Sequence, residues 1–154
     1  MSHEARFAAL NLELPTAPKA MGLYRPLLVV DQMAYLSGHG PLRTDNTLIC
    51  GRLGDDLDVD AGFQAARQTG LAMLATLKAQ CGSLDRVKRL VKTFGLVLST
   101  EGFAEQPTVI NGFSELMRDV FGEEHGIAAR SAVGASSLPG GITVEIEAIF
   151  ELEK

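Results

Sequence analysis

The alternation of apolar and polar residues is clearest near the C-terminus, where every second position from Ile142 to Phe150 is apolar. A period of two residues predicts a β-strand with one buried face. The preceding segment 129–136 consists mostly of small residues and reads as another strand. Because only the turn-forming segment 138–141 separates the two, we predict that they pair as a final hairpin.

Three further strands are predicted upstream. Two apolar runs, 27–30 and 33–38, are separated by two residues, which is the length of a tight hairpin connection. The latter part of 86–99 is rich in β-branched and bulky apolar residues and predicts a long buried strand. The polar, glycine-containing stretch 41–58 predicts a loop with a short strand at 48–50.

Two segments show helical periodicity. Between residues 59 and 82, apolar residues recur every third or fourth position; Asp60 is the predicted N-cap and Gly82 the predicted end. Residues 106–121 predict a second helix. A short helical turn is expected at residues 3–10.

This order of elements predicts an α+β fold in a single domain: a mixed, mostly antiparallel sheet with both long helices packed on one face. A chain of 154 residues is long enough for one hydrophobic core. The opposite face of the sheet is left uncovered, and segment 129–136 lacks the charges that protect an exposed surface. We therefore expect self-association.

Composition excludes several functional classes. The net charge of −5, the absence of tryptophan and the low aromatic content disfavour nucleic-acid binding. The N-terminal segment has no apolar run typical of a signal peptide or membrane span, which predicts a cytoplasmic protein. Cys50 and Cys81 lack metal-site spacing and are expected to be buried, reduced thiols.

Three residues are candidates for chemistry. Arg130 stands alone among small and apolar neighbours, so it forms either a salt bridge to an adjacent strand or an anchor for a ligand carboxylate. Glu145 would lie beside it if the final hairpin forms, and could orient a water molecule; the alternative is a solvent-facing glutamate like Glu147. His39, predicted to follow a strand end, has no partner for metal binding or catalysis and is more often inert.

No HExxH, GxSxG, P-loop or GxGxxG pattern occurs in the chain. Metalloprotease, α/β-hydrolase and nucleotide-binding functions therefore lack their minimum residues. We expect neither a metal nor a cofactor.

The segments 129–134 (ARSAVG), 138–140 (LPG) and 144–148 (VEIEA) together resemble the C-terminal signature of the YjgF/RidA family of reactive-intermediate deaminases. Upstream, Ala17-Pro18 with Gly22-Leu23-Tyr24, Leu36-Ser37-Gly38, Val91-Lys92-Thr93 and Val109-Ile110-Asn111 follow the family's order. The resemblance begins at about Ala17, so residues 1–16 are interpreted as an N-terminal extension and 17–154 as the family domain. It implies a chorismate mutase-like fold assembled as a homotrimer, with sites between subunits.

The resemblance also implies an activity: hydrolysis of 2-imino acids and their enamine tautomers to 2-keto acids and ammonia, without a cofactor or metal. By position, Arg130 would bind the substrate carboxylate and Glu145 would place or activate the attacking water. The substrate-binding residues would be Tyr24, Ser37, Gly38, Asn111 and, through its backbone amide, Ala132.

Some positions depart from the family pattern. Leu23 replaces the usual proline, Ala132 a common cysteine and His39 an amide side chain, and the stretch 41–60 is longer than in compact members. These differences indicate a divergent branch. Two alternatives remain open: a non-catalytic trimer that binds small carboxylates, and the endoribonuclease activity with which part of the family is labelled, which the acidic charge disfavours.

Overall fold

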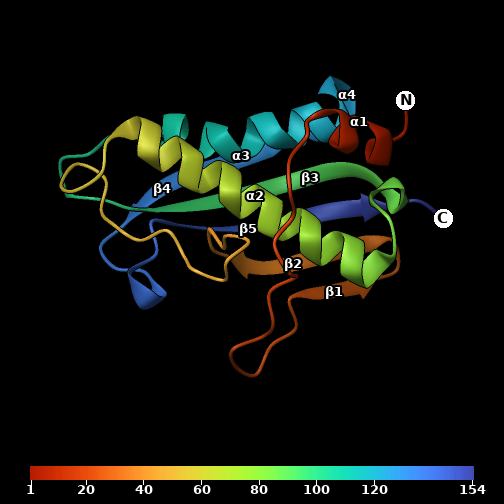
Figure 1. The fold of residues 1–154 in the computed structure, drawn as a ribbon, viewed down its shortest axis with the longest axis horizontal. Coiled ribbons are helices and arrows are strands. Elements are labelled where there is room, and N and C mark those ends of the chain that lie inside the picture. The colour runs from red at the N-terminus through yellow and green to blue at the C-terminus, as the bar shows by residue number, and fades with distance from the viewer.

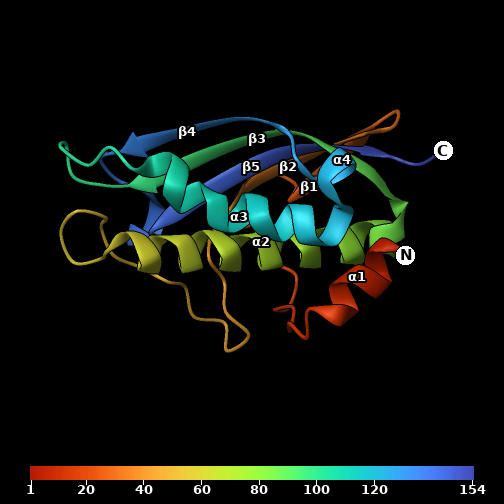
Figure 2. The same ribbon diagram turned by 90° about the horizontal axis from the view of Figure 1, so that it is seen from above.

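The computed structural model describes residues 1–154, arranged as a five-stranded sheet with its helices on one side (Figures 1 and 2). The elements are α1 (His3–Ala9), β1 (Leu27–Val30), β2 (Met33–His39), α2 (Val59–Cys81), η1 (Leu84–Arg86), β3 (Val87–Leu98), α3 (Gln106–Phe121), α4 (Glu123–Gly126), β4 (Ala129–Ala135), η2 (Pro139–Gly141) and β5 (Val144–Leu152).

The strands follow the order β1-β2-β5-β3-β4, and every neighbouring pair is antiparallel except β3 and β4. The sheet is therefore mixed and mostly antiparallel, and α2 and α3 pack on the same face, as predicted (Figure 2). The α+β fold class is confirmed.

The predicted final hairpin is wrong. β4 lies at the edge of the sheet, parallel to β3, while β5 inserts between β2 and β3. The reason is the strand–helix–strand order β3-α3-β4, because a helical crossover places its two strands parallel and adjacent. The alternating strand β5 then takes a central position, where Val144, Ile146 and Phe150 are buried.

The hairpin of β1 and β2 is confirmed, and Asp31 adopts the left-handed conformation (φ 54°) that its tight turn requires. The N-cap of helix α2 lies two residues earlier than expected: it is Asp58 instead of Asp60, and the Asp58 carboxylate accepts a 2.8 Å hydrogen bond from Ala61 N. The expected strand at 48–50 is reduced to isolated bridges, Leu42 with Leu48 and Cys50 with Ile142.

One hydrophobic core lies between the sheet and the helices. Its largest buried side chains include Phe113, Phe121 and Phe150, and it extends to Phe7 of α1, so the N-terminal segment packs on the rest of the fold. The expectation of buried thiols is wrong: Cys50 is exposed and Cys81 is partly buried. None of the helices is both long and apolar enough to cross a bilayer.

Candidate functional site

A β-bulge in β2 shapes the neighbourhood of Glu145. Leu36 pairs with Ala148 and His39 with Ile146, so two residues of β2, Ser37 and Gly38, lie opposite a single residue of β5. The extra residue changes which face the following side chain occupies. As a result Gly38 remains on the open face, and His39 turns toward the helices.

The Glu145 carboxylate rests directly on Gly38. A Cβ atom at position 38 would lie 2.7 Å from Glu145 Oε1, so only glycine leaves room for the carboxylate in this position. Burial, with a smaller contribution from Glu147, raises the pKa of Glu145. Glu145 is half-buried and differs in this respect from Glu147, which is exposed.

A cavity of about 750 Å³ opens beside this carboxylate, and Tyr24, Ser37 and Gly38 also line it. The Ser37 hydroxyl donates a 2.6 Å hydrogen bond to the carbonyl of Arg25, and the Tyr24 hydroxyl accepts a 3.2 Å bond from Met21 N. The Ser37 bond attaches the 18–26 loop to the bulge, and the Tyr24 bond closes a turn within the loop. Four of the predicted site residues are therefore brought together.

Arg130 lies elsewhere, at the β4 edge over α3. Its Nη1 donates to Asn111 Oδ1 (2.8 Å) and Ser114 Oγ (3.1 Å), and its Nη2 donates to the Pro107 carbonyl (3.4 Å). The chain's ion pairs do not include Arg130, so the predicted salt bridge to a neighbouring strand is absent. Partial burial lowers the pKa of its guanidinium.

A second cavity, of about 360 Å³, lies beside Arg130 and is also lined by Asn111 and Ser114. Ala132, two residues further along β4, packs against the core. Arg130 and Asn111 therefore form a second group, with Ala132 on the same face of the same strand.

The two groups do not meet within one protomer. Arg130 pairs with Thr93, which in turn pairs with Ala148, a buried residue on the helix face. Side chains alternate between the two faces along a strand, and Glu145 lies three positions before Ala148. The Glu145 side chain therefore lies on the opposite, open face of the sheet. The expectation that a hairpin brings Arg130 beside Glu145 is therefore wrong for a single chain.

His39 is a buried residue of β2 and does not lie in a loop as predicted. Its Nδ1 lies 2.6 Å from the Ser37 carbonyl and its Nε2 lies 2.8 Å from Thr76 Oγ1 on α2. Because a carbonyl oxygen only accepts, Nδ1 carries the proton and the neutral ring's Nε2 accepts from the threonine hydroxyl. Burial lowers the pKa of His39, so the neutral ring bridges the bulge to the helix layer.

Sequence reasoning missed two kinds of residue. Ser114 follows Asn111 by three positions, a helical spacing that places both on one face and could have indicated a joint contact. Leu42 and Leu48 line the cavity near Glu145 but come from the 41–58 loop, where no periodic pattern existed to place them. No cluster of three or more histidine, cysteine or acidic side chains is arranged to hold a metal ion.

Residues 4–140 match the family described as "YjgF/chorismate mutase-like, putative endoribonuclease". The chain belongs to the YjgF/RidA family. Protein TCP17 of Trypanosoma cruzi is 39% identical over 148 residues, which cover 96% of this chain and 92% of that protein.

Solved structures of YjgF/RidA relatives share the fold. A Shewanella oneidensis protein titled a "putative endoribonuclease" superimposes with a TM-score of 0.93 at 30% sequence identity. The match covers 99% of this chain and 100% of the Shewanella chain. The Agrobacterium tumefaciens protein Atu1372, of unknown function, gives 0.88 at 36% identity, covering 99% and 92%. RidA from an Antarctic Psychrobacter has the same fold with a TM-score of 0.60 at 24% identity, covering 89% and 94%.

Proposed function

We propose that the protein hydrolyses 2-imino acids and their enamine tautomers to 2-keto acids and ammonia, at sites formed between copies of the chain. The observation that carries the proposal is the state of Arg130, whose guanidinium meets only neutral acceptors within the protomer. A partly buried cation without a carboxylate partner, next to a cavity, is suited to binding an anionic ligand.

Asn111 and Ser114 hold the guanidinium in place without neutralising it. A planar guanidinium fixed in this way can bind a carboxylate through two parallel hydrogen bonds, which sets the orientation of the substrate as well as its affinity. The imine carbon adjacent to the carboxylate is then held at a defined distance from the anchor.

Glu145 supplies proton transfer in this mechanism. Water adds to the imine carbon and gives a proton to the carboxylate, and protonated Glu145 passes that proton to the nitrogen, which yields a carbinolamine. In a second transfer the carboxylate takes the hydroxyl proton of the carbinolamine and passes it to the amino nitrogen, so that the carbon–nitrogen bond breaks and leaves the 2-keto acid and ammonia. A raised pKa suits a group that accepts and returns a proton near neutral pH. Such assistance contributes roughly 10²–10⁴-fold to a rate.

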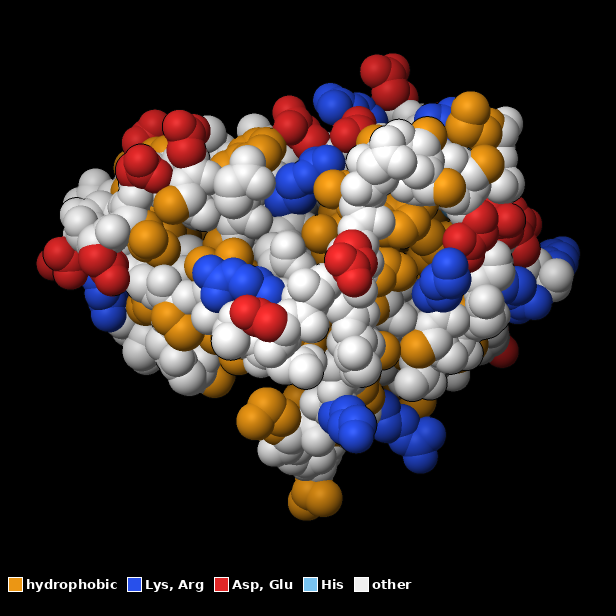
Figure 3. Space-filling model, in the orientation of Figure 1, with side chains coloured by type: hydrophobic (Ala, Val, Ile, Leu, Met, Phe, Trp, Pro, Cys, Tyr) orange, Lys and Arg blue, Asp and Glu red, His pale blue; other side chains and the backbone are white.

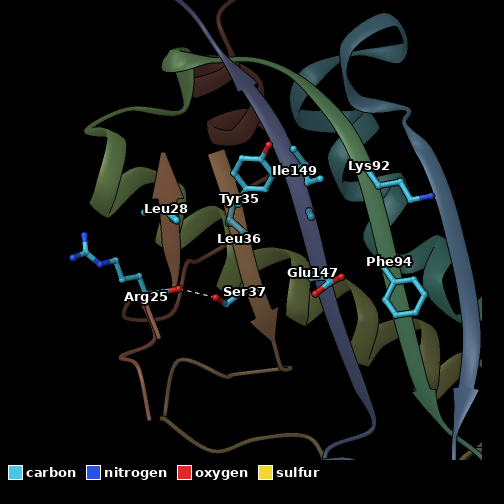
Figure 4. Close-up of a pocket in the computed structure, with 10 residues that line it drawn as sticks. Arg25, Leu28, Tyr35, Leu36, Ser37, Lys92, Phe94, Glu147 and Ile149 are labelled. Carbon is cyan, nitrogen blue, oxygen red and sulfur yellow. Dashed lines mark hydrogen bonds between the residues drawn. The ribbon is translucent and has the colours of Figure 1, made fainter. Parts of the chain in front are cut away.

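The geometry supports an assembly of several copies. Because Arg130 and Glu145 occupy opposite faces of the sheet, a site with both groups requires two chains. The open face carries a hollow of about 510 Å³ in which the exposed apolar residues Leu28 and Tyr35 accompany Arg25, Lys92 and Glu147 (Figure 4). Contact between copies through this face, in a homotrimer, would bury these apolar groups.

The first prediction concerns Arg130. An enzyme that generates 2-iminopropanoate is coupled to the protein, and imine decay is followed against the uncatalysed rate. We expect Arg130→Ala to lower kcat/KM by at least 100-fold, since an oriented charge–carboxylate contact contributes about 3 kcal/mol or more. Arg130→Lys should recover little, because an ammonium group lacks the planar fork.

The matched control is Arg86→Ala, which removes an exposed arginine at the end of η1 that lines neither cavity. Its activity should equal that of the wild type. If the wild type accelerates no imine yet binds 2-keto acids through Arg130, the protein is a non-catalytic carboxylate binder. If Arg130→Ala is fully active, the proposed mechanism is rejected.

A further inference from the structure

The cavity beside Glu145 continues past the carboxylate into an apolar corner. A Cβ atom at Gly40 would lie 3.0 Å from Ile142 Cδ1 and 3.5 Å from Leu48 Cδ2, so these two side chains close over the backbone of Gly40. Leu42 and Pro139 line the same cavity. The wall beyond Glu145 is therefore built mainly from aliphatic groups.

The distance between the apolar corner at Gly40 and the Glu145 carboxylate, the proposed reaction centre, follows from the backbone that joins them. Glu145 rests on Gly38, and the corner closes over Gly40, two residues along the chain. At about 3.3 Å per residue in extended backbone, the two points are roughly 6.6 Å apart. An aliphatic side chain of leucine or methionine size, attached to a carbon held at Glu145, reaches this corner; a methyl group does not.

The volume of the cavity also favours a side chain long enough to reach the corner. A cavity of about 750 Å³ corresponds to roughly 25 water molecules at about 30 Å³ each. A neighbouring copy in the proposed assembly would occupy part of this space, but a three-carbon 2-imino acid, with six heavy atoms, would still leave the aliphatic wall in contact with water. A ligand with a longer apolar side chain would displace the water from the aliphatic wall and bury both surfaces.

Hydrogen bonds of the 41–58 loop hold its wall residues, Leu42 and Leu48, in position. Leu42 pairs with Leu48 across the loop, and the Leu42 carbonyl accepts a 2.7 Å hydrogen bond from Gln68 Nε2 on α2. A backbone hydrogen bond of 2.8 Å from Arg43 N to the Thr47 carbonyl closes the loop tip. The corner is thus tied to the helix layer and formed before a ligand enters.

We propose that the site selects 2-imino acids with apolar side chains of about leucine size over three-carbon imines, with Leu48 and Ile142 as the specificity-determining residues. This inference rests on the proposed function for the chemistry of the head group. The reaction remains the addition of water to the carbon–nitrogen double bond, with release of the 2-keto acid and ammonia.

Two measurements test the selectivity. In the first, calorimetry compares the binding of pyruvate with that of 4-methyl-2-oxopentanoate, the 2-keto acid product with the leucine side chain. Each buried methylene strengthens binding about fourfold, so we expect the larger product to bind at least tenfold more tightly. In the second, amino-acid oxidase generates the imines of alanine, 2-aminobutyrate, norvaline and leucine, and kcat/KM should rise along this series.

Leu48→Trp fills the corner and should reduce the leucine-to-alanine ratio of kcat/KM at least tenfold. Thr44→Trp adds the same bulk to the same loop outside the cavity and should leave the ratio unchanged. Equal or tighter binding of pyruvate, or a ratio unaffected by Leu48→Trp, overturns the inference. A protein that binds the larger keto acid selectively but hydrolyses no imine supports the pocket and rejects the proposed catalysis.

Discussion

At the scale of single residues, Glu145 combines two opposing demands. In the proposed mechanism its carboxylate is accessible to a substrate, yet it lies half-buried against Gly38 and near Glu147, which raises its pKa. Burial disfavours the ionised form, so the charged carboxylate lowers the stability of the fold at neutral pH. Functional groups often carry such a cost to stability.

Replacing Glu145 should therefore change activity and stability in opposite directions. The ionised form accepts the proton, so wild-type kcat/KM should fall as the pH drops through the raised pKa, with a midpoint above 4.5, the ordinary glutamate value. Glu145→Gln should abolish most activity. At pH 7.5 its Tm should exceed that of the wild type by on the order of 1–2 °C, and the difference should shrink as the pH falls and the wild-type carboxyl becomes neutral.

The neighbouring Glu147 carboxylate provides the control for the raised pKa of Glu145. Since Glu147 raises the pKa of Glu145, Glu147→Gln should move the acid limb of the pH–rate profile to lower pH while retaining activity. A pH–rate profile identical in the wild type and Glu147→Gln would contradict the electrostatic explanation.

At the scale of secondary-structure elements, the crossing of α2 and α3 sets the position of the Arg130 anchor. A Cβ atom at Gly112 would collide with the carbonyl oxygen of Phe63, so the two helices approach with backbone against backbone. Gly112 follows Asn111 directly, and the close crossing therefore fixes the register of the amide that holds Arg130.

Gly112→Ala tests the crossing. The added methyl group has no space beside a helix backbone, so the helices must separate, at a cost of about 3 kcal/mol of unfolding free energy. Gly102→Ala adds the same atom in an exposed turn where nothing lies within 4 Å, and should change stability little. Denaturant unfolding measures both; equal stability of the two variants would contradict the described packing.

The elements themselves were largely predictable from the sequence, because the periods of α2, α3 and β5 are strong and glycine marks the ends of both long helices. The strand order was not. The short connection between β4 and β5 favoured a hairpin, whereas the β3-α3-β4 crossover placed β4 beside β3 and left β5 central.

The same limit applied to the site. Tyr24, Ser37, Gly38 and Glu145 line one cavity, but the face that each side chain occupies depends on the bulge and on strand order, which residue patterns do not encode.

At the scale of the whole molecule, the candidate site residues form two separate groups. The Arg130 group belongs to the helix side of the β4 edge, and the Glu145 group belongs to the open face. The 18–26 loop projects from the body (Figure 1), and its residues Met21 and Leu23 are almost fully exposed. In the same orientation, hydrophobic side chains lie at the lower end of the surface in Figure 3. A monomer would leave these apolar groups in water.

Mixed assemblies test whether two chains share each site. Arg130→Ala and Glu145→Gln should each be inactive alone. When the two are assembled together in equal amounts, roughly a quarter of the interfaces in a cyclic oligomer receive both intact groups, so about that fraction of wild-type activity should return. Mixing the separately assembled proteins without exchange is the control, and no recovery after co-assembly would mean that the site lies within one chain.

The contact between Gly38 and Glu145 also constrains how the sequence can diverge. Any side chain at position 38 would displace the carboxylate, so we expect a sequence that keeps the acid in this place to keep the glycine as well. Loss of the acid would remove that restriction, and position 38 would then be open to drift. The absence of a side chain at position 38 is thus coupled to the placement of a carboxylate on the neighbouring strand.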